Sequence, residues 1–328
     1  MQEDQLVLGI DIGGTKTALG VVTRDGRLLE EMVLPSEAAR GKDVLMKRIV
    51  SAAGELITGQ QFGKRIAAIG VGFPGPISPA TCKVAEAPNL PGWEGVSLCE
   101  VLSGALSIPT YGDNDANAAA LGEWLYGSGR GTRDFIYLTI STGIGCGIIS
   151  GGRLIQGTSG YSGEVGHMIM DPLGPECGCG RRGCLETLAS GTAIGRQART
   201  RLSKGEESVL SELGRPVEDI TAREVFEGAA QEDPLCQDIL DEAMGWIAIG
   251  CNNLLVTLNP SRIALGGGVG LGGNWFLEDI EQRLRELSPK EHFGIELVQA
   301  SLGKNAGIVG AGAVAWLRID PMLSSEAP

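Results

Sequence analysis

Residues 6–16 read LVLGIDIGGTK, and this stretch decides the fold. Its apolar part, Leu6–Ile10, predicts a strand, and Gly13-Gly14 predicts a turn at the end of that strand. Two further strands are predicted at Thr17–Thr23 and Leu28–Leu34, because a hairpin signal separates these two runs. The chain therefore opens with three consecutive strands around a Gly/Thr-rich turn.

The same plan recurs in the middle of the chain. Leu138–Leu154 repeats the order of Leu8–Leu28, which is strand, Gly/Thr-rich turn, strand, glycine turn, strand. This weak internal duplication indicates two similar lobes. Strands alternate with helical stretches such as Lys42–Thr58 and Pro234–Leu258, and the alternation indicates an α/β class.

A length of 328 residues is comfortable for two domains. We expect an N-terminal α/β lobe at residues 1–120 and a C-terminal α/β lobe at residues 121–304, with a small metal-binding loop at 167–186. Gly307–Arg318 is a helical stretch of small residues that can pack back on the first lobe. We therefore expect a C-terminal helix, at about residues 305–320, to join the N-terminal lobe.

Composition narrows the class of protein. A net charge of −13 and the lack of a Lys/Arg block predict no nucleic-acid partner. No apolar run of about 18 residues is present, so we predict no membrane-spanning helix. The start of the chain, Met1–Gln5, is polar and short, which predicts no signal peptide and a cytoplasmic location.

Three of the eight cysteines are packed into eight residues. Together with a preceding histidine they form the pattern H-x9-C-x-C-x4-C, made by His167, Cys177, Cys179 and Cys184. Three thiolates and one imidazole are the ligand set of a closed, tetrahedral zinc site. The alternative is one local disulfide plus a free thiol, but disulfides are rare in the cytosol, so we favour structural zinc.

Two glycine-rich turns are candidates for binding phosphate. The first follows a strand and contains Asp11, Gly13, Gly14, Thr15 and Lys16. It does not match the P-loop pattern, but its backbone N–H groups could cup phosphate while Asp11 faces Mg²⁺. Taken alone it could be only a turn. The second, with Thr142, Gly143 and Gly145, has the matching place in the second lobe, and two such turns could clamp a polyphosphate.

Two further segments have competing interpretations. Gly268–Gly273 satisfies G-x-G-x-x-G, but it comes late in the chain and lacks a clean βαβ unit. We favour a strand-end nucleotide contact there over a dehydrogenase fold. Asn114-Asp115-Ala116-Asn117 lies at a strand-to-helix junction, where the aspartate could be only a helix N-cap. It could also be the carboxylate that accepts a hydroxyl proton during phosphorylation.

Together these motifs resemble the ROK family from about residue 6 to about residue 316. The matching motifs are Asp11–Lys16, Pro88–Trp93, Asn114–Asn117, Thr142–Gly145, Gly163–His167 and Cys177–Glu186. The resemblance implies an actin/hexokinase-like ATPase fold with two ribonuclease H-like lobes, with a sugar and ATP bound in the cleft. It implies an ATP-dependent sugar kinase, and the family is usually homodimeric or homotetrameric.

The resemblance also implies roles for single residues. Asp115 would be the general base on the sugar hydroxyl. The residues implied to hydrogen-bond the sugar are Asn89, Asn114, Glu164, His167 and Glu186. One ring nitrogen of His167 would bind zinc and the other would face the sugar, so zinc would organise the sugar site. Asp11 and the two turns would hold Mg-ATP, and Gly267 and Gly268 would lie near the adenosine.

The motifs do not specify which sugar accepts the phosphoryl group. Glucose is favoured, and N-acetylmannosamine, fructose or another sugar are the alternatives, because the named contacts suit hydroxyls shared by several hexoses. A non-catalytic sugar-binding regulator is the third hypothesis, but Asp115 is intact, and a first strand by residue 6 leaves no room for a DNA-binding arm. A donor other than ATP, such as polyphosphate, stays open. Ser141 and Cys146 replace two glycines common in the family's second turn.

Overall fold

The structure is a computed structural model, and it describes residues 5–59, 62, 65–87, 90–288 and 294–323. The chain forms two compact units. The first contains Met1–Tyr137, Gly147–Gly163 and Ala300–Pro328, and the second contains Leu138–Cys146 and Glu164–Gln299. The lobe boundary expected at residues 120 and 121 falls inside a helix of the first unit, and as a lobe boundary it stays a prediction.

The first unit contains a mixed five-stranded sheet. Its strands are β1 (Leu6–Ile12), β2 (Lys16–Val22), β3 (Leu28–Pro35), β4 (Ile66–Phe73) and β5 (Thr110–Asn114), in the order β3-β2-β1-β4-β5. The β1–β2 and β2–β3 pairs are antiparallel, whereas β1–β4 and β4–β5 are parallel. Because parallel strands point the same way, the carboxyl ends of β1, β4 and β5 share one edge of this sheet.

Helices cover both faces of that sheet. They are α1 (Lys42–Thr58), α2 (Leu98–Leu106), α3 (Asp115–Tyr126) and α10 (Ala306–Ile319). Leu8 and Ile10 face a core that includes Leu45 and Ile49 of α1. The alternate residue Gly9 faces α10, where a Cβ would lie 2.2 Å from the carbonyl oxygen of Ile308.

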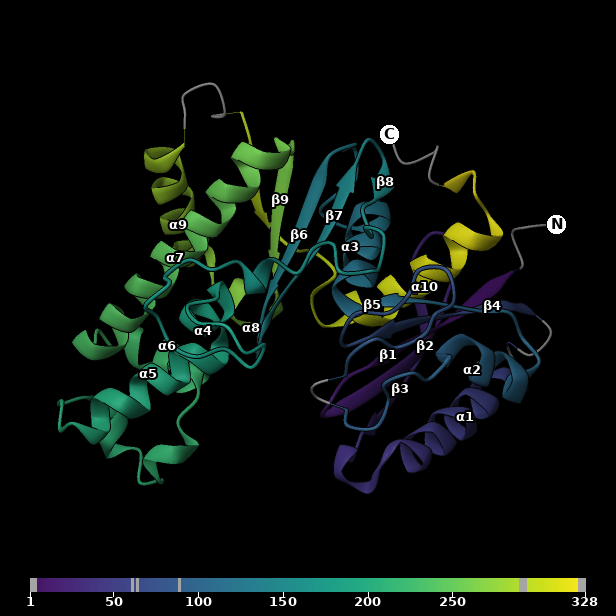
Figure 1. The fold of residues 1–328 in the computed structure, drawn as a ribbon, viewed down its shortest axis with the longest axis horizontal. Helices are drawn as coiled ribbons and strands as arrows, with labels where there is room; N and C mark the ends of the chain where they lie inside the picture. The colour runs from purple at the N-terminus through teal and green to yellow at the C-terminus, as the bar shows by residue number, and fades with distance from the viewer. Residues whose placement is uncertain (1–4, 60–61, 63–64, 88–89, 289–293, 324–328) are drawn as a thin grey trace. The chain divides into compact units, whose positions relative to one another are not determined.

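Helix α10 lies directly on the sheet because glycines remove side chains between them. It contacts β1, β4 and α3, as Figure 1 shows. A Cβ on Gly70 of β4 would lie only 1.8 Å from the carbonyl oxygen of Ala311. Such an approach excludes every residue but glycine.

The second sheet has the order β10-β9-β6-β7-β8. Its strands are β6 (Phe135–Ile140), β7 (Ile144–Ser150), β8 (Arg153–Leu154), β9 (Arg262–Gly266) and β10 (Glu296–Gln299). The β7–β8 pair is antiparallel and the β9–β10 pair is parallel. Both sheets therefore mix strand directions, and the predicted α/β class is confirmed.

The second unit contains the helices α4 (Leu185–Ala189), α5 (Gly191–Ser203), α6 (Ala222–Ala229), α7 (Pro234–Leu258), α8 (Gly267–Gly270) and α9 (Asn274–Leu287). Side-chain caps begin three of them. Ser190 caps α5, Thr221 and Glu224 form a capping box on α6, and Asp233 caps α7 ahead of Pro234. Helix α7 packs against α4, α5, α6 and α9 (Figure 1).

One disulfide joins Cys82 to Cys99, which the sequence did not predict. The two cysteines are 17 residues apart, and the bridge between Lys83 and Ser97 brings them together with a Cα–Cα distance of 5.7 Å. Both sulfurs lie against β5, because a Cβ on Gly112 would be 2.6 Å from one and 3.2 Å from the other.

The spacing of apolar residues predicted the long elements well. The bounds of α1 and α7 agree with the predicted Lys42–Thr58 and Pro234–Leu258. The sequence analysis missed the short helices α2 and α4, because segments of nine and five residues contain too few helical turns to show a repeating apolar pattern. Among the described helices, none combines the length and the apolar character needed to cross a membrane.

Candidate active site and metal centre

The first glycine-rich turn links β1 to β2. Gly13 donates its N–H to the carbonyl of Lys16 at 3.0 Å. Ser36, which directly follows β3, donates its hydroxyl to the Gly13 carbonyl and its N–H to the Thr15 carbonyl. A Cβ on Gly13 would lie 2.7 Å from the Lys16 carbonyl oxygen, so glycine is required for space. Thr15 and Lys16 are exposed at this turn. The arrangement is a compact hairpin whose tip is open to solvent.

Asp11 lies at the end of β1, against the start of α10. A Cβ on Gly307 would come within 2.1 Å of its Oδ2. Desolvation raises the pKa of Asp11 from 3.8 to about 6, against the opposing effect of the Lys16 ammonium. A carboxylate held largely out of water gains when a cation neutralises it, so Asp11 suits the predicted approach of Mg²⁺.

Asp11 and Asp115 lie on either side of Gly72, at the carboxyl edge of β1, β4 and β5. A Cβ on Gly72 would be 3.6 Å from Asp11 Oδ1 and 3.6 Å from the Cα of Asp115. Asp11 at the end of β1 and Asp115 directly after β5 therefore lie at one edge of the sheet, where open parallel sheets bind their ligands. The structure thus brings together two residues that the sequence separates by about a hundred positions.

The helix cap at the start of α3 is Asn114, not Asp115. Asn114 Oδ1 accepts the N–H groups of Ala116 at 2.9 Å and Asn117 at 3.2 Å, and its Nδ2 donates to the carbonyl of Gly75 at 3.3 Å. The capping alternative that we considered for Asp115 is therefore wrong. Asp115 is the first residue of the helix, and its Oδ1 accepts the Ala116 N–H at 2.8 Å.

The second glycine-rich turn links β6 to β7 and is held from two sides. Ser141 donates its N–H to the Gly143 carbonyl at 2.9 Å, and the start of α5 supplies the Gly191 N–H, which donates to the Ser141 carbonyl at 2.7 Å. Glu186 of α4 accepts the Ile144 N–H at 2.9 Å. The predicted residues Thr142, Gly143 and Glu186 thus lie together in the second unit.

Cys146 fits where a glycine was expected in this turn. It is buried, and burial raises the pKa of its thiol, so the side chain stays neutral. A neutral thiol behaves as a small apolar group.

The four predicted metal ligands converge. One ligand atom from each of His167, Cys177, Cys179 and Cys184 lies within 4.8 Å of the others. His167 Nδ1 is 3.6 Å from Cys177 Sγ, and Cys179 Sγ is 3.7 Å from Cys184 Sγ. All three cysteines are free, so the disulfide alternative is wrong. The donor set and spacing fit a tetrahedral zinc ion.

Charge in the cluster favours binding of a cation. Desolvation opposes ionisation of the Cys179 thiol, but hydrogen bonds from Arg181 and the neighbouring thiols outweigh it and lower its pKa. Burial raises the pKa of Cys177 and of Cys184. One thiolate is therefore prepared at neutral pH, and binding of a metal would release the protons of the others.

His167 faces two ways. Its Nδ1 lies beside Cys177, while its Nε2 points to Glu164, with 4.0 Å between Nε2 and Glu164 Oε2. The expected division between a metal-facing and a ligand-facing nitrogen is compatible with this geometry. Asn89, another predicted sugar ligand, lies outside the described residues.

A protein-family model described as the ROK family matches residues 7–318. The chain belongs to the ROK family. A glucokinase of Halalkalibacterium halodurans is 33% identical over 317 residues, covering 96% of this chain and 95% of the relative. An N-acetylmannosamine kinase of Escherichia coli is 31% identical over 308 residues, covering 94% of this chain and 97% of the relative.

A solved ROK structure is similar over nearly the whole chain. It is a ROK family glucokinase from Streptomyces griseus in complex with glucose and AMPPNP. Its TM-score is 0.83 at 34% identity, and the match covers 94% of this chain and 99% of that chain. The predicted fold, that of the hexokinase-like ATPases, is confirmed.

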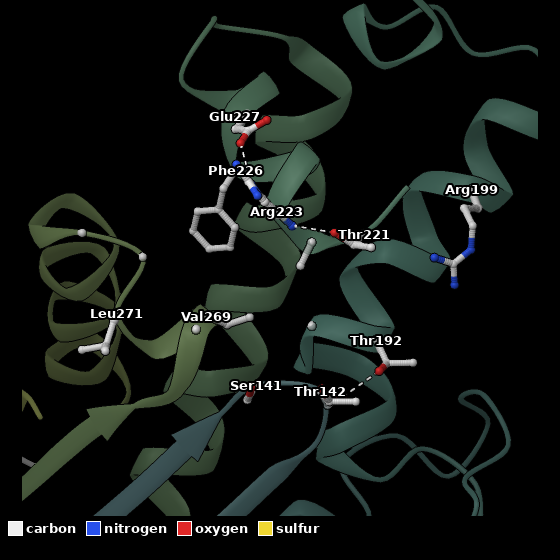
Figure 2. Close-up of a pocket in the computed structure, with 15 residues that line it drawn as sticks. Ser141, Thr142, Thr192, Arg199, Thr221, Arg223, Phe226, Glu227, Val269 and Leu271 are labelled. Atoms are coloured by element: carbon white, nitrogen blue, oxygen red, sulfur yellow. Dashed lines mark hydrogen bonds and ion pairs between the residues drawn. The ribbon is translucent and has the colours of Figure 1, made fainter. Parts of the chain in front are cut away.

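The second unit of this ROK chain contains a pocket, and the sequence motifs predicted only some of the residues that line it. The pocket has a volume of about 830 Å³ and is bordered by the second turn, α5, α6 and the segment after β9. Figure 2 shows Thr142 and Thr192 joined by a hydrogen bond at one end and the ring of Phe226 toward the other. Of the predicted nucleotide contacts, Thr142 and Gly268 border it, whereas Gly267 packs on β6.

The sequence analysis did not single out Phe226 or Asp113, which the structure places beside the pocket and beside the Asn114-Asp115 motif of this ROK chain. Phe226 is fixed in the pocket wall by Phe276, with 5.4 Å between ring centroids, but helical spacing alone makes Phe226 look like any core aromatic. Asp113 precedes the Asn114-Asp115 motif and is buried, accepting hydrogen bonds from Asn117 Nδ2 and the Asn114 N–H at 2.8 Å each. Burial raises the pKa of Asp113, and an acidic residue beside the candidate catalytic motif was the available signal.

Proposed function

We propose that this chain is an ATP-dependent hexose kinase that transfers the γ-phosphoryl group of ATP to a hydroxyl of glucose, forming glucose 6-phosphate. The observation that carries the proposal is the placement of Asp11 and Asp115 about Gly72 at one sheet edge. Phosphoryl transfer to an alcohol needs one carboxylate for the proton and one for the metal, and little other covalent chemistry.

Asp115 serves as the general base. It accepts the proton of the attacking hydroxyl as the oxygen approaches the γ-phosphorus. Its position as the first residue of α3, directly after the Asn114 cap, holds the carboxylate at a defined place. That positioning is the main contribution an enzyme makes to this reaction.

Asp11 faces Mg²⁺, directly or through water. When bound, Mg²⁺ neutralises charge that develops on the phosphate oxygens. The first turn, with Gly13, Gly14, Thr15 and Lys16, and the second turn, with Thr142, Gly143 and Gly145, bind phosphate, because backbone N–H groups in such turns form anion sites. The 830 Å³ pocket takes the adenosine, with the apolar face of Phe226 against the base and Gly267 and Gly268 near it.

Asn89, Asn114, Glu164, His167 and Glu186 hydrogen-bond the sugar. His167 would bind zinc through Nδ1, and this would orient the ring and leave Nε2 for the sugar. Asn114 Oδ1 accepts both of the hydrogen bonds that cap α3, so the Nδ2 group of Asn114 is the part that reaches a sugar hydroxyl. The sugar therefore meets both donors and acceptors, as hydroxyl recognition requires.

The second candidate acceptor is N-acetylmannosamine. It is favoured by the 31% identical kinase of Escherichia coli that is named for that sugar. Glucose is preferred because the 33% identical relative and the structure with bound glucose carry the glucokinase name. A cytoplasmic location, the lobes 1–120 and 121–304, and assembly as a homodimer or homotetramer are part of the same proposal.

A coupled ADP-release assay with Mg-ATP tests the function. It compares glucose, N-acetylmannosamine, mannose, fructose and N-acetylglucosamine, with Asp115→Asn as the inactive control. We expect selective turnover of glucose. Selective turnover of another sugar would keep the mechanism and replace the acceptor. Sugar binding without any turnover would contradict the kinase and favour a sugar-binding regulator.

A further inference from the structure

We propose that Glu186 is a positioning residue for the nucleotide as well as a sugar ligand. Its carboxylate holds the turn at residues 141–144 in the shape that receives phosphate, and thereby ties this turn to the scaffold of the metal centre. The inference rests on the proposed function, since it deepens the role of the second turn.

The first support is the contact between Glu186 and the turn. Glu186 Oε2 accepts the N–H of Ile144 at 2.9 Å, and a Cβ on Gly143 would lie 2.3 Å from that same oxygen. Gly143 has no positive φ. The Glu186 carboxylate therefore occupies the space beside Gly143, and a side chain at position 143 would displace it, although the backbone angle itself does not require glycine.

The second support is the bonding of the turn itself. The first three carbonyls of the turn are engaged: Ser141 by the Gly191 N–H, Thr142 by the Thr192 hydroxyl at 2.7 Å, and Gly143 by the Ser141 N–H. Within the described part of the chain, the N–H groups of Thr142 and Gly143 have no hydrogen-bond partner. Two adjacent free donors beside fixed carbonyls form an anion-binding concavity.

The third support is where Glu186 comes from. It is the second residue of α4, whose N-cap is the metal ligand Cys184. The carbonyl of Ile144 lies close to a second segment of the metal centre. A Cβ on Gly166 would lie 2.2 Å from the Ile144 carbonyl oxygen, and Gly166 directly precedes the metal ligand His167. Ile144 thus donates its N–H to the segment that follows Cys184, and its carbonyl lies against the segment that contains His167.

A role for Glu186 in sugar binding alone would leave this contact unexplained. The bond to Ile144 uses Oε2, so Oε1 stays available for a hydroxyl, and the two roles are compatible. They differ in one measurable respect. A pure sugar ligand changes the affinity for sugar, whereas a positioning residue changes the affinity for nucleotide when no sugar is present.

The test is calorimetric titration of the full chain with Mg-AMPPNP in the absence of sugar, comparing wild type, Glu186→Ala and Glu186→Gln. We expect Glu186→Ala to weaken nucleotide binding about tenfold, because a hydrogen bond to a charged acceptor is lost. Glu186→Gln should stay within about threefold of wild type, since its amide oxygen can accept from Ile144. Glu218→Ala, an exposed carboxylate of the same unit, is the matched control and should leave binding unchanged.

Nucleotide affinity unchanged in Glu186→Ala, with only sugar affinity lowered, would overturn the inference. Loss of zinc from Glu186→Ala would also overturn it, because the effect would then arise from the metal, so zinc content is measured in every variant. If wild type itself neither binds Mg-AMPPNP nor phosphorylates a sugar, the proposed function fails instead. The two failures are therefore distinguishable.

If Glu186→Ala does not fold, a second variant, Gly143→Ala, tests the contact between Glu186 and the turn. Gly143→Ala places a methyl group against the carboxylate and should weaken sugar-free nucleotide binding about tenfold, with zinc retained. Unchanged affinity in Gly143→Ala would contradict the proposed contact. Where both single variants fold, the double variant should be no weaker than either one, because both remove the same contact. Additive losses would contradict it.

Discussion

Asp11 Oδ2 occupies the space that a side chain would need on Gly307, since a Cβ there would come within 2.1 Å of the oxygen. The carboxylate therefore lies at the start of α10, where the partial positive charge of a helix N-terminus favours an anion. Desolvation still dominates, because the pKa of Asp11 is raised to about 6. The chain accepts a destabilising charge at a place where the proposed reaction needs one.

Asp11→Asn should stabilise the protein at neutral pH while abolishing transfer. The folded state binds the proton of Asp11 more tightly than the unfolded state, so the free energy of unfolding falls as pH rises from about 4 to about 6. The shift from 3.8 to about 6 corresponds to at most about 3 kcal/mol, and less where water still reaches the carboxylate. Urea unfolding of both proteins at pH 4 and pH 8 checks this.

At pH 4 the unfolding free energies of wild type and Asp11→Asn should differ least, which makes that pH the internal control. A variant that gained nothing at pH 8 would show that Asp11 does not carry a desolvated charge in the absence of ligands.

Asp115→Asn should lower kcat by a factor of at least about 100 while changing sugar affinity less than threefold. Loss of a general base typically costs that much, and the asparagine oxygen can still accept the Ala116 N–H. Steady-state kinetics and sugar titration check the split. Comparable losses of affinity and turnover would instead assign Asp115 a structural role.

Cys179→Ser should lose zinc and weaken sugar binding. The hydroxyl of serine is a poor ligand for zinc, and without the metal His167 loses its fixed ring orientation. Elemental analysis of the purified protein and sugar titration are the measurements. Cys236→Ala, which removes a cysteine outside the cluster, should keep its metal. Wild-type zinc content in Cys179→Ser would refute the four-ligand site.

Glu123→Gln should destabilise the first unit by about 2–4 kcal/mol. The Glu123 side chain is fully buried and accepts hydrogen bonds from the backbone N–H groups and hydroxyls of Ser128 and Ser301 and from the Leu302 N–H. An amide would turn two acceptor sites into donors that face these donors. Urea unfolding measures the loss, and exposed Glu100→Gln should change stability by less than about 0.5 kcal/mol.

Short-range sequence patterns were sufficient to predict most of the fold and the ligands of the metal centre. The helical pattern of Pro234–Leu258 predicted α7 to both of its ends. The ligands from Cys177 to Cys184 lie so close in the chain that folding has few ways to separate them. Where the chemistry sits within one short loop or one regular element, the sequence alone is sufficient.

Contacts across long stretches of chain could not be predicted in this way. Nothing in the pattern around Glu186 shows that its carboxylate meets Ile144, which is 42 residues earlier. The capping role of Asn114 was missed because asparagine and aspartate cap helices about equally well, and only the hydrogen bonds distinguish them. Cys82 and Cys99 approach each other only because an intervening bridge closes their loop.

The place of α10 in the first unit has a consequence for how the protein forms during synthesis. The sheet surface at Gly9 and Gly70 is shaped for the backbone of α10 and has no side chains of its own to close it. The ribosome must therefore make all of the second unit before the first can complete its core. By contrast, the second unit needs only Leu138–Cys146 and Glu164–Gln299, so it can finish first although it begins later.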